Sequence, residues 1–114
     1  MQIKTHEHNK QKIAEIIAEE VVINSIDDAL ELIGNLYYEG YEKIIITENN
    51  ITADFFNLKT KLAGEILQKF AQYQMPLVIV GDFEKYNSNS LRDFIYESNK
   101  GKQINFVANI NEIL

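Results

Sequence analysis

Two carboxylates stand directly after apolar stretches of the chain. Glu48 follows the run 43–47, and Asp82 follows the run 77–80 and one glycine. If both runs are neighbouring parallel strands, their carboxyl ends meet where open α/β sheets bind ligands. A close carboxylate pair there can share a proton, hold Mg²⁺ or act as acid and base. The structural alternative, which we favour, is that Asp82 closes a turn in its own loop and Glu48 is solvated.

A cationic group is expected near the same place. Arg92 is the chain's one arginine, and it stands beside Ser90 at the start of a predicted helix. Backbone N–H groups at a helix start can hold an anion, and a guanidinium adds a fork of donors. The structural alternative is a salt bridge from Arg92 to Asp82 or Glu97, and we favour it. Asn49, Ser90, Arg92 and the two carboxylates are therefore our candidate contacts for a ligand or partner.

Other chemistries find little support in the residue types. The chain has no Cys, which excludes disulfides and thiolate catalysis. His6 and His8 have no third metal ligand beside them, so we expect a solvated loop there. Neither histidine has a nucleophile nearby in the sequence, and no Gly-rich phosphate loop is present. We therefore predict no metal and no other cofactor, and whether the protein is an enzyme is left open, with binding without catalysis favoured.

Size and charge limit both the fold and the partners. The chain has 114 residues, 46% of them hydrophobic, which is enough for one domain with its own core. Its 17 acidic and 11 basic residues give a formal net charge of -6, which disfavours nucleic acid and anionic membranes as partners. Residues 1–8 are polar, without a signal-peptide core, so we expect a cytoplasmic protein. Assembly into a homo-oligomer is left open.

The N-terminal quarter of the chain favours β-structure. Residues 2–5 and 12–17 are typical of short strands, and the polar stretch 6–11 between them is typical of a hairpin loop. Residues 20–24 are rich in Val and Ile and predict a third strand. A hairpin adds an antiparallel element to whatever parallel strands follow.

Three helices are predicted in the rest of the chain. Ser25 has the type and spacing of a helix cap and begins the first, which Gly40 ends. Apolar residues at helical spacing predict a second helix through residues 55–73. Ser90 is the expected cap of the third, which Gly101 ends.

The order of these elements predicts the fold class. Strands at 43–47, 77–80 and 104–108 alternate with the helices, and a final helical turn is expected at 109–114. Right-handed crossovers then pack the helices on a largely parallel sheet. We predict one α/β domain spanning residues 1–114, with a mixed, mostly parallel sheet of about five to six strands, an N-terminal hairpin and three main helices.

Four segments of the chain resemble a known protein family. They are Phe55-Phe56-Asn57-Leu58, the stretch 62–70, Val80-Gly81-Asp82-Phe83 and the stretch 90–97. Through them the chain resembles, over nearly its whole length, a bacterial family named domain of unknown function 4180. The family's name implies no activity, so the resemblance does not decide the function.

The element order is also similar to that of STAS domains, the fold of sulphate-transporter tails and anti-sigma-factor antagonists. In those antagonists a helix begins Asp-Ser-Ser-Gly-Leu-Gly, and a serine there accepts a phosphate from a kinase. The segment 60–63 falls at a comparable place, so the resemblance implies that Thr60 is the phosphoacceptor. Lys59 stands where the antagonists have Asp, and Lys61 stands where the closer family has Gly.

Two functions are open as hypotheses. The first is a cytoplasmic regulatory or protein-interaction module, switched by phosphorylation at Thr60, that meets a partner protein through residues 48–60 and 81–93. We call these residues the carboxyl rim. The second is a small-molecule- or anion-binding protein, or a minor enzyme, that uses Glu48, Asp82 and Arg92. A flat surface with exposed apolar groups favours the first, and a concave pocket favours the second.

Overall fold

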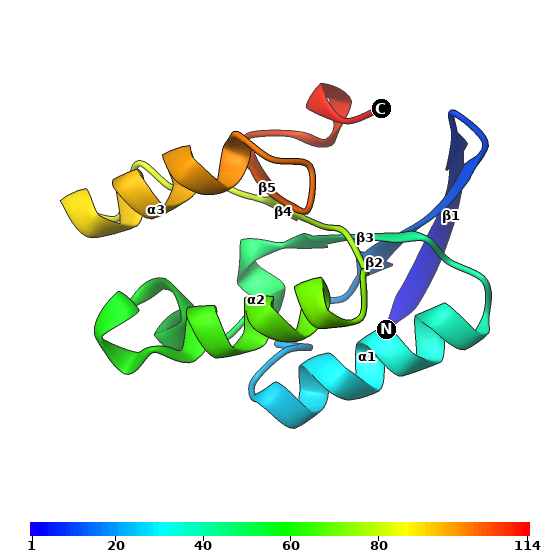
Figure 1. The fold of residues 1–114 in the computed structure, drawn as a ribbon, viewed down its shortest axis with the longest axis horizontal. Helices are drawn as coiled ribbons and strands as arrows, with labels where there is room; N and C mark the ends of the chain where they lie inside the picture. Colours follow the sequence, from blue (N-terminus) through cyan, green and yellow to red (C-terminus); the bar gives the residue numbers. More distant parts are fainter.

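In the computed structural model, which describes residues 1–114, one sheet and three α-helices account for most of the chain (Figure 1). The strands and helices are β1 (Gln2–His8), β2 (Gln11–Ile17), α1 (Ile26–Tyr38), β3 (Lys43–Thr47), α2 (Leu62–Gln72), β4 (Leu77–Val80), α3 (Asn89–Asn99) and β5 (Ile104–Val107). Short 3-10 turns are η1 (Glu48–Asn50), η2 (Ala53–Phe56), η3 (Leu58–Thr60) and η4 (Ile110–Glu112). The predicted α/β class and mixed sheet are confirmed.

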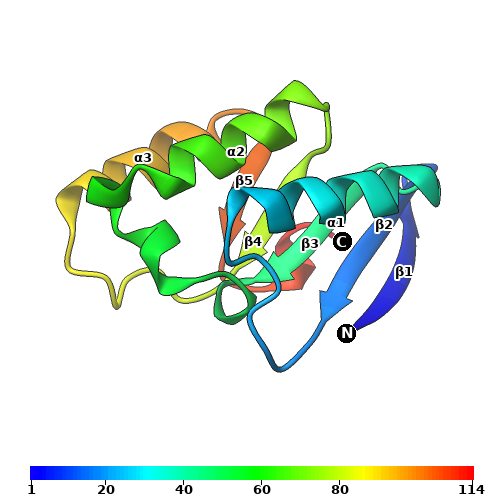
Figure 2. The same cartoon turned by 90° about the horizontal axis from the view of Figure 1, so that it is seen from below.

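The five strands lie in the sheet in the order in which they occur along the chain. β1 and β2 form an antiparallel hairpin, and β2, β3, β4 and β5 are parallel neighbours. Because each strand lies beside the previous one and parallel crossovers are right-handed, successive helices arrive on the same face of the sheet. Figure 2 shows α1, α2 and α3 over that face.

The two faces of the sheet carry different amounts of core. On the helix-covered face, Ile44, Ile46 and Ile79 belong to a cluster of 23 buried side chains. On the opposite face, Ile45 packs in a small buried cluster, and Ile113 near the C-terminus covers part of it. β3 is therefore buried on both faces, as its unbroken apolar sequence predicts.

Two predicted elements are absent or broken. Residues 20–24 form no strand, and only Ile23 makes an isolated bridge, to Ile51. The predicted helix 55–73 is divided into η2, η3 and α2. The division before α2 falls at Lys61, whose φ of 65° is left-handed. Side chains other than glycine disfavour that conformation, and it cannot continue a right-handed helix.

The N-terminal hairpin is tighter than predicted. The expected loop 6–11 shrinks to Asn9 and Lys10, which both have positive φ. Positive φ at both central residues is typical of the type I′ turn, whose twist matches that of the strands it joins. His6 consequently lies in β1 rather than in a solvated loop, and its Nε2 atom is 2.8 Å from Glu15 Oε1 on β2.

The ends of the helices follow local capping signals. Ser25 caps α1 with its side chain, and Gly40 follows the helix with a φ of 88°, as predicted. α3 begins earlier than expected, because Ser88 rather than Ser90 is its cap, with Oγ accepting the Leu91 N–H. The longest helix, α1, has 13 residues, and none of the helices has the length and apolar character to cross a membrane.

Candidate functional site

The structure brings Glu48 and Asp82 together at the carboxyl rim. Thr47 at the end of β3 pairs in register with Val80 at the end of β4, so the residues after them are neighbours. The contact is not a carboxylate pair, because Glu48 Oε1 accepts the backbone N–H of Asp82 at 2.9 Å. Asp82 Oδ1 accepts the Glu84 N–H at 3.2 Å, the turn that the structural alternative predicts.

Glu48 is buried rather than solvated, which corrects the expectation for this residue. It is 7% exposed, and its Oε2 atom accepts the Tyr86 hydroxyl at 2.8 Å and lies 3.0 Å from Lys85 Nζ. A buried carboxylate is tolerated when hydrogen bonds and an opposite charge compensate for its lost hydration. Through these three partners, Glu48 fastens residues 82–86, which we call the 82–86 loop.

Gly81 makes the approach of Glu48 possible. A Cβ atom at position 81 would lie 2.7 Å from Glu48 Cγ and 2.8 Å from Cδ. Those separations are shorter than carbon atoms tolerate, and the Glu48 side chain is held by its hydrogen bonds. Glycine is therefore required at position 81 for close packing rather than for an unusual φ.

Tyr86, the last residue of the 82–86 loop, is held by its hydrogen bond to Glu48. Burial, the hydrogen bond to Glu48 and the negative charge of Glu48 together raise the pKa of Tyr86 to about 12. Its ring stacks on Phe56 with centroids 5.1 Å apart. Tyr86 is thus a neutral hydroxyl donor at ordinary pH. Reasoning from sequence did not single out Tyr86 or Lys85, because no periodicity or motif marks their partnership with Glu48, which is far away along the chain.

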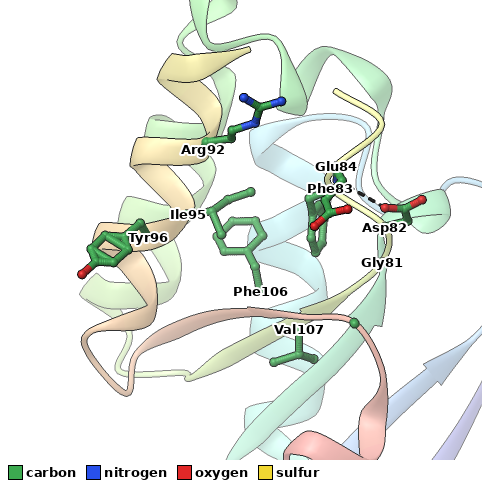
Figure 3. A pocket seen from close by; sticks show the side chains of 10 residues that line it. Gly81, Asp82, Phe83, Glu84, Arg92, Ile95, Tyr96, Phe106 and Val107 are labelled. Carbon is green, nitrogen blue, oxygen red and sulfur yellow. Dashed lines mark hydrogen bonds between the residues drawn. The ribbon is translucent and has the colours of Figure 1, made fainter. Parts of the chain in front are cut away.

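A groove of about 600 Å³ opens between the 82–86 loop and α3, beyond the carboxyl ends of β4 and β5 (Figure 3). We call it the α3 groove. Phe83, Ile95 and Phe106 form its apolar floor, with Arg92 on the helix side and Asp82 and Glu84 on the loop side. Its remaining lining residues are Gly81, Tyr96, Val107 and Ala108.

Arg92 does not form the predicted salt bridge. Its guanidinium donates one hydrogen bond, from Nη1 to Asn89 Oδ1 at 3.2 Å, and makes no ion pair. Asp82 is held by its own turn, and Glu97 pairs with Lys100 at 3.0 Å. Because a guanidinium carries five N–H donors, most of those of Arg92 are free to bind something else.

A comparison with known protein families matches nearly the whole chain, including the α3 groove. The family model described as domain of unknown function (DUF4180) matches residues 8–114. The chain belongs to the DUF4180 family. No curated protein and no solved structure gives a significant match. The match is to DUF4180 alone, so the similarity to STAS domains stays a prediction.

Two other candidate contacts of this DUF4180 domain lie outside the α3 groove. Asn49 is exposed in η1, whereas its neighbour Asn50 is buried and donates from Nδ2 to the carbonyls of Ala18 and Glu20. Ser90 lines a second depression of about 450 Å³, between the η2–η3 segment and the start of α3. No group of three or more side chains of the types that bind metals is found.

Thr60 of the DUF4180 domain is exposed at the end of η3, but its hydroxyl is already engaged. Oγ1 lies 2.8 Å from the carbonyl oxygens of both Asp54 and Asn57, and it accepts the Leu62 N–H at 3.2 Å. In this geometry the Thr60 side chain holds the turn that leads into α2. A phosphate at Oγ1 would have to replace these contacts.

Proposed function

We propose that this DUF4180 domain is a small-molecule-binding protein whose site is the α3 groove. The observation that carries the proposal is the unpaired guanidinium of Arg92 beside an apolar floor, at the carboxyl ends of two parallel strands. Open α/β sheets bind ligands at such strand ends. The volume of about 600 Å³ is in the range of small-molecule sites.

The lining of the groove favours binding over catalysis. None of its ten residues is His, Cys, Ser, Thr or Lys. Nucleophilic catalysis needs a nucleophile next to a base, and these residues supply none of the usual pairs. Asp82 or Glu84 could act as a general base, but the Asp82 side chain bonds only the Glu84 N–H and the Glu84 side chain makes no hydrogen bond, so neither is paired with a nucleophile or an acid. A minor enzyme is therefore the weaker form of this proposal.

The wall formed by the 82–86 loop supports the same function. Glu48 accepts hydrogen bonds from both Asp82 and Tyr86, and it pairs with Lys85. A wall that is fixed before the ligand arrives does not lose conformational freedom on binding, which improves affinity. Glu48 is accordingly a positioning residue rather than a ligand contact.

The test is an NMR titration of the full chain with a set of small fragments, some carrying a carboxylate and an apolar group. We expect the backbone resonances of Glu84, Ile95 and Val107 to shift with the carboxylate-bearing fragments. Arg92→Gln should abolish the shifts, and Lys100→Gln, which removes a cation near the other end of α3, should leave them unchanged. If no fragment shifts the groove resonances, the proposal is wrong.

A protein-interaction module is the second candidate, and two observations support it. Tyr37, Tyr38 and Tyr73 are 70%, 90% and 50% exposed, and aromatic residues are enriched at interfaces. Thr60 is exposed at the end of η3, between Lys59 and Lys61 and two residues before α2 begins. A phosphate on Thr60 would add nearly two negative charges at that helix start and alter its contacts with a partner protein.

Mass spectrometry of the protein purified from its own cells tests this second candidate. Phosphate on Thr60, with altered partner binding by Thr60→Glu and unaltered binding by Lys59→Gln, is the expected result. If Thr60 is consistently unmodified, the hypothesis of a phosphorylation switch at Thr60 is wrong. The cytoplasmic location expected from the sequence belongs to both proposals, and fractionation of those cells tests it.

A further inference from the structure

We infer that the α3 groove recognises a zwitterion of about dipeptide size, with a carboxylate at one end, a protonated amine at the other and an apolar group between them. The inference rests on the proposed function and names the chemical class of the ligand. It follows from how charged and apolar side chains are distributed around the groove.

Opposite charges lie on the two sides of the groove without meeting. Arg92 lies on the α3 side and Glu84 lies on the loop side, whereas the Asp82 carboxylate points out of the loop, away from Arg92 (Figure 3). No ion pair joins Arg92 to either carboxylate. Glu84 makes no side-chain hydrogen bond, and the one bond of Asp82 is to its own loop. A ligand with one charge of each sign would satisfy both sides together.

Several main-chain polar groups of the groove are already hydrogen-bonded within the protein, so side chains are the main groups available to recognise a ligand. The Val107 carbonyl accepts the Gly81 N–H at 2.9 Å, and the Ala108 N–H donates to Glu112 at 2.8 Å. The Asp82 N–H is bound by Glu48. With those main-chain groups already paired, Arg92 and Glu84 are the charged groups that remain for a ligand in the groove.

The volume of the groove, about 600 Å³, and its apolar floor guide the choice of the ligand's size and middle. Two extended residues span about 7 Å, so the free ends of a dipeptide can reach groups that do not reach each other. Phe83 and Phe106 meet edge to face at 5.3 Å, and with Ile95 they offer an apolar surface between the charges. A side chain such as that of leucine would be buried against this floor.

Four probes with the same apolar part test the inference by calorimetry on the full chain. They are Leu-Leu with free ends, its N-acetyl form, its C-terminal amide and the doubly capped form. We expect the free dipeptide to bind most tightly, and each cap to weaken binding about tenfold, because each removes one charge-assisted contact.

Variants assign each end of the ligand to one side of the groove. Arg92→Gln should weaken the free and N-acetyl forms and leave the two amides unchanged. Glu84→Gln should weaken the free dipeptide and its amide and leave the two acetylated forms unchanged. Lys100→Gln serves as the charge-matched control for Arg92. Unfolding temperatures equal to that of the unmodified chain show that the variants are folded.

The outcomes separate this inference from the proposed function. Equal binding of all four probes in the groove would overturn the zwitterion and leave a small-molecule site. If only purely anionic or neutral fragments bind, the zwitterion is likewise overturned and a small-molecule site remains. If the affinity for the free dipeptide is unchanged by Arg92→Gln, the inference is also overturned. If no probe and no fragment shifts the groove resonances, both the inference and the proposed function fail.

Discussion

Glu48 connects the end of β3 to the 82–86 loop, and its contacts show how one residue shapes the rim. Its carboxylate accepts the Asp82 N–H and the Tyr86 hydroxyl, and it pairs with Lys85. The close contact with Gly81 leaves no space for a larger side chain there. The side-chain position of Glu48 thus determines where the loop wall of the α3 groove lies.

Removing the Glu48 carboxylate should destabilise the fold. We expect Glu48→Ala to lower the free energy of unfolding by about 2–3 kcal/mol, because two partly buried donors lose their acceptor. Glu48→Gln should cost about 1 kcal/mol, because an amide oxygen still accepts one bond. Lys85→Ala should cost less than about 1 kcal/mol, since this cation is half exposed. Urea unfolding measures all three, and equal losses for alanine and glutamine would contradict this account.

Tyr86 should make stability depend on pH at the alkaline end. Its pKa is about 12 in the folded chain and 10 in an ordinary setting, so the unfolded chain ionises first as pH rises. The stabilisation is complete below pH 10 and is lost as pH rises towards 12. Tyr86→Phe should remove this loss. The difference between the tyrosinate absorbance titrations of the two proteins should have a midpoint near 12, and a midpoint near 10 would refute the assignment.

Among the secondary-structure elements, the segment before α2 differs most from the single helix that its apolar spacing predicts. The apolar residues from position 55 onwards recur at helical spacing, and Phe55, Ile66 and Phe70 are all buried in the main core. The backbone nevertheless forms η2, η3 and then α2, with Lys61 left-handed between the last two. Burial thus recurs at helical spacing across a segment that is not one helix. A glycine at position 61, as the family resemblance implies, adopts this conformation without strain.

Substitutions at position 61 should report this backbone conformation. Lys61→Val should lower the free energy of unfolding by about 1–2 kcal/mol, because β-branched residues strongly disfavour positive φ. Lys61→Gly should be neutral within about 0.5 kcal/mol, since relief of strain offsets the added freedom of the unfolded chain. Lys59→Val, on the same exposed segment, controls for the loss of a lysine. Thermal unfolding compares the variants, and equal stability of the valine and glycine variants at position 61 would contradict the assignment.

At the scale of the molecule, the sequential strand order leaves β1 and β5 at the edges of the sheet. Unpaired edges invite pairing with other chains. On β5, Asn99 of α3 covers the edge: its Oδ1 accepts the Phe106 N–H at 2.7 Å, and its Nδ2 donates to the Phe106 carbonyl at 3.0 Å. Ser98 Oγ donates to the Ile104 carbonyl at 2.8 Å. Side chains of α3 therefore take the place of a sixth strand.

Opening this edge should promote self-association. Asn99→Ala removes both bonds to Phe106, which we expect to cost about 1–2 kcal/mol of unfolding free energy and to free one edge position for another strand. Size-exclusion chromatography over a range of concentrations should show larger species for this variant. Asn87→Ala, at an exposed residue without a side-chain hydrogen bond, should behave as the unmodified chain. Identical elution of Asn99→Ala would show that the edge is protected by other means.

Local signals in the sequence determined most of the elements. Strands β3, β4 and β5 follow from short, mostly apolar runs, and α1 follows from its Ser25 cap and the Gly40 stop. These features depend on residues close together in the chain, where periodicity and capping act. The α/β class and the mixed sheet follow from the order of those elements, and the family resemblance is confirmed over residues 8–114.

The tertiary structure decided the site. The sequence offered as a hypothesis that Glu48 and Asp82 lie at one rim if their strands are neighbours, but it did not predict that Glu48 would be buried and bind the Asp82 backbone. It also predicted a partner for Arg92 that the structure does not provide. The contacts of Glu48 join residues more than thirty positions apart, as in the pair Glu48 and Tyr86. Strand register and the packing of α3 determine which long-range groups meet, and neither is encoded in the residues on either side of each position.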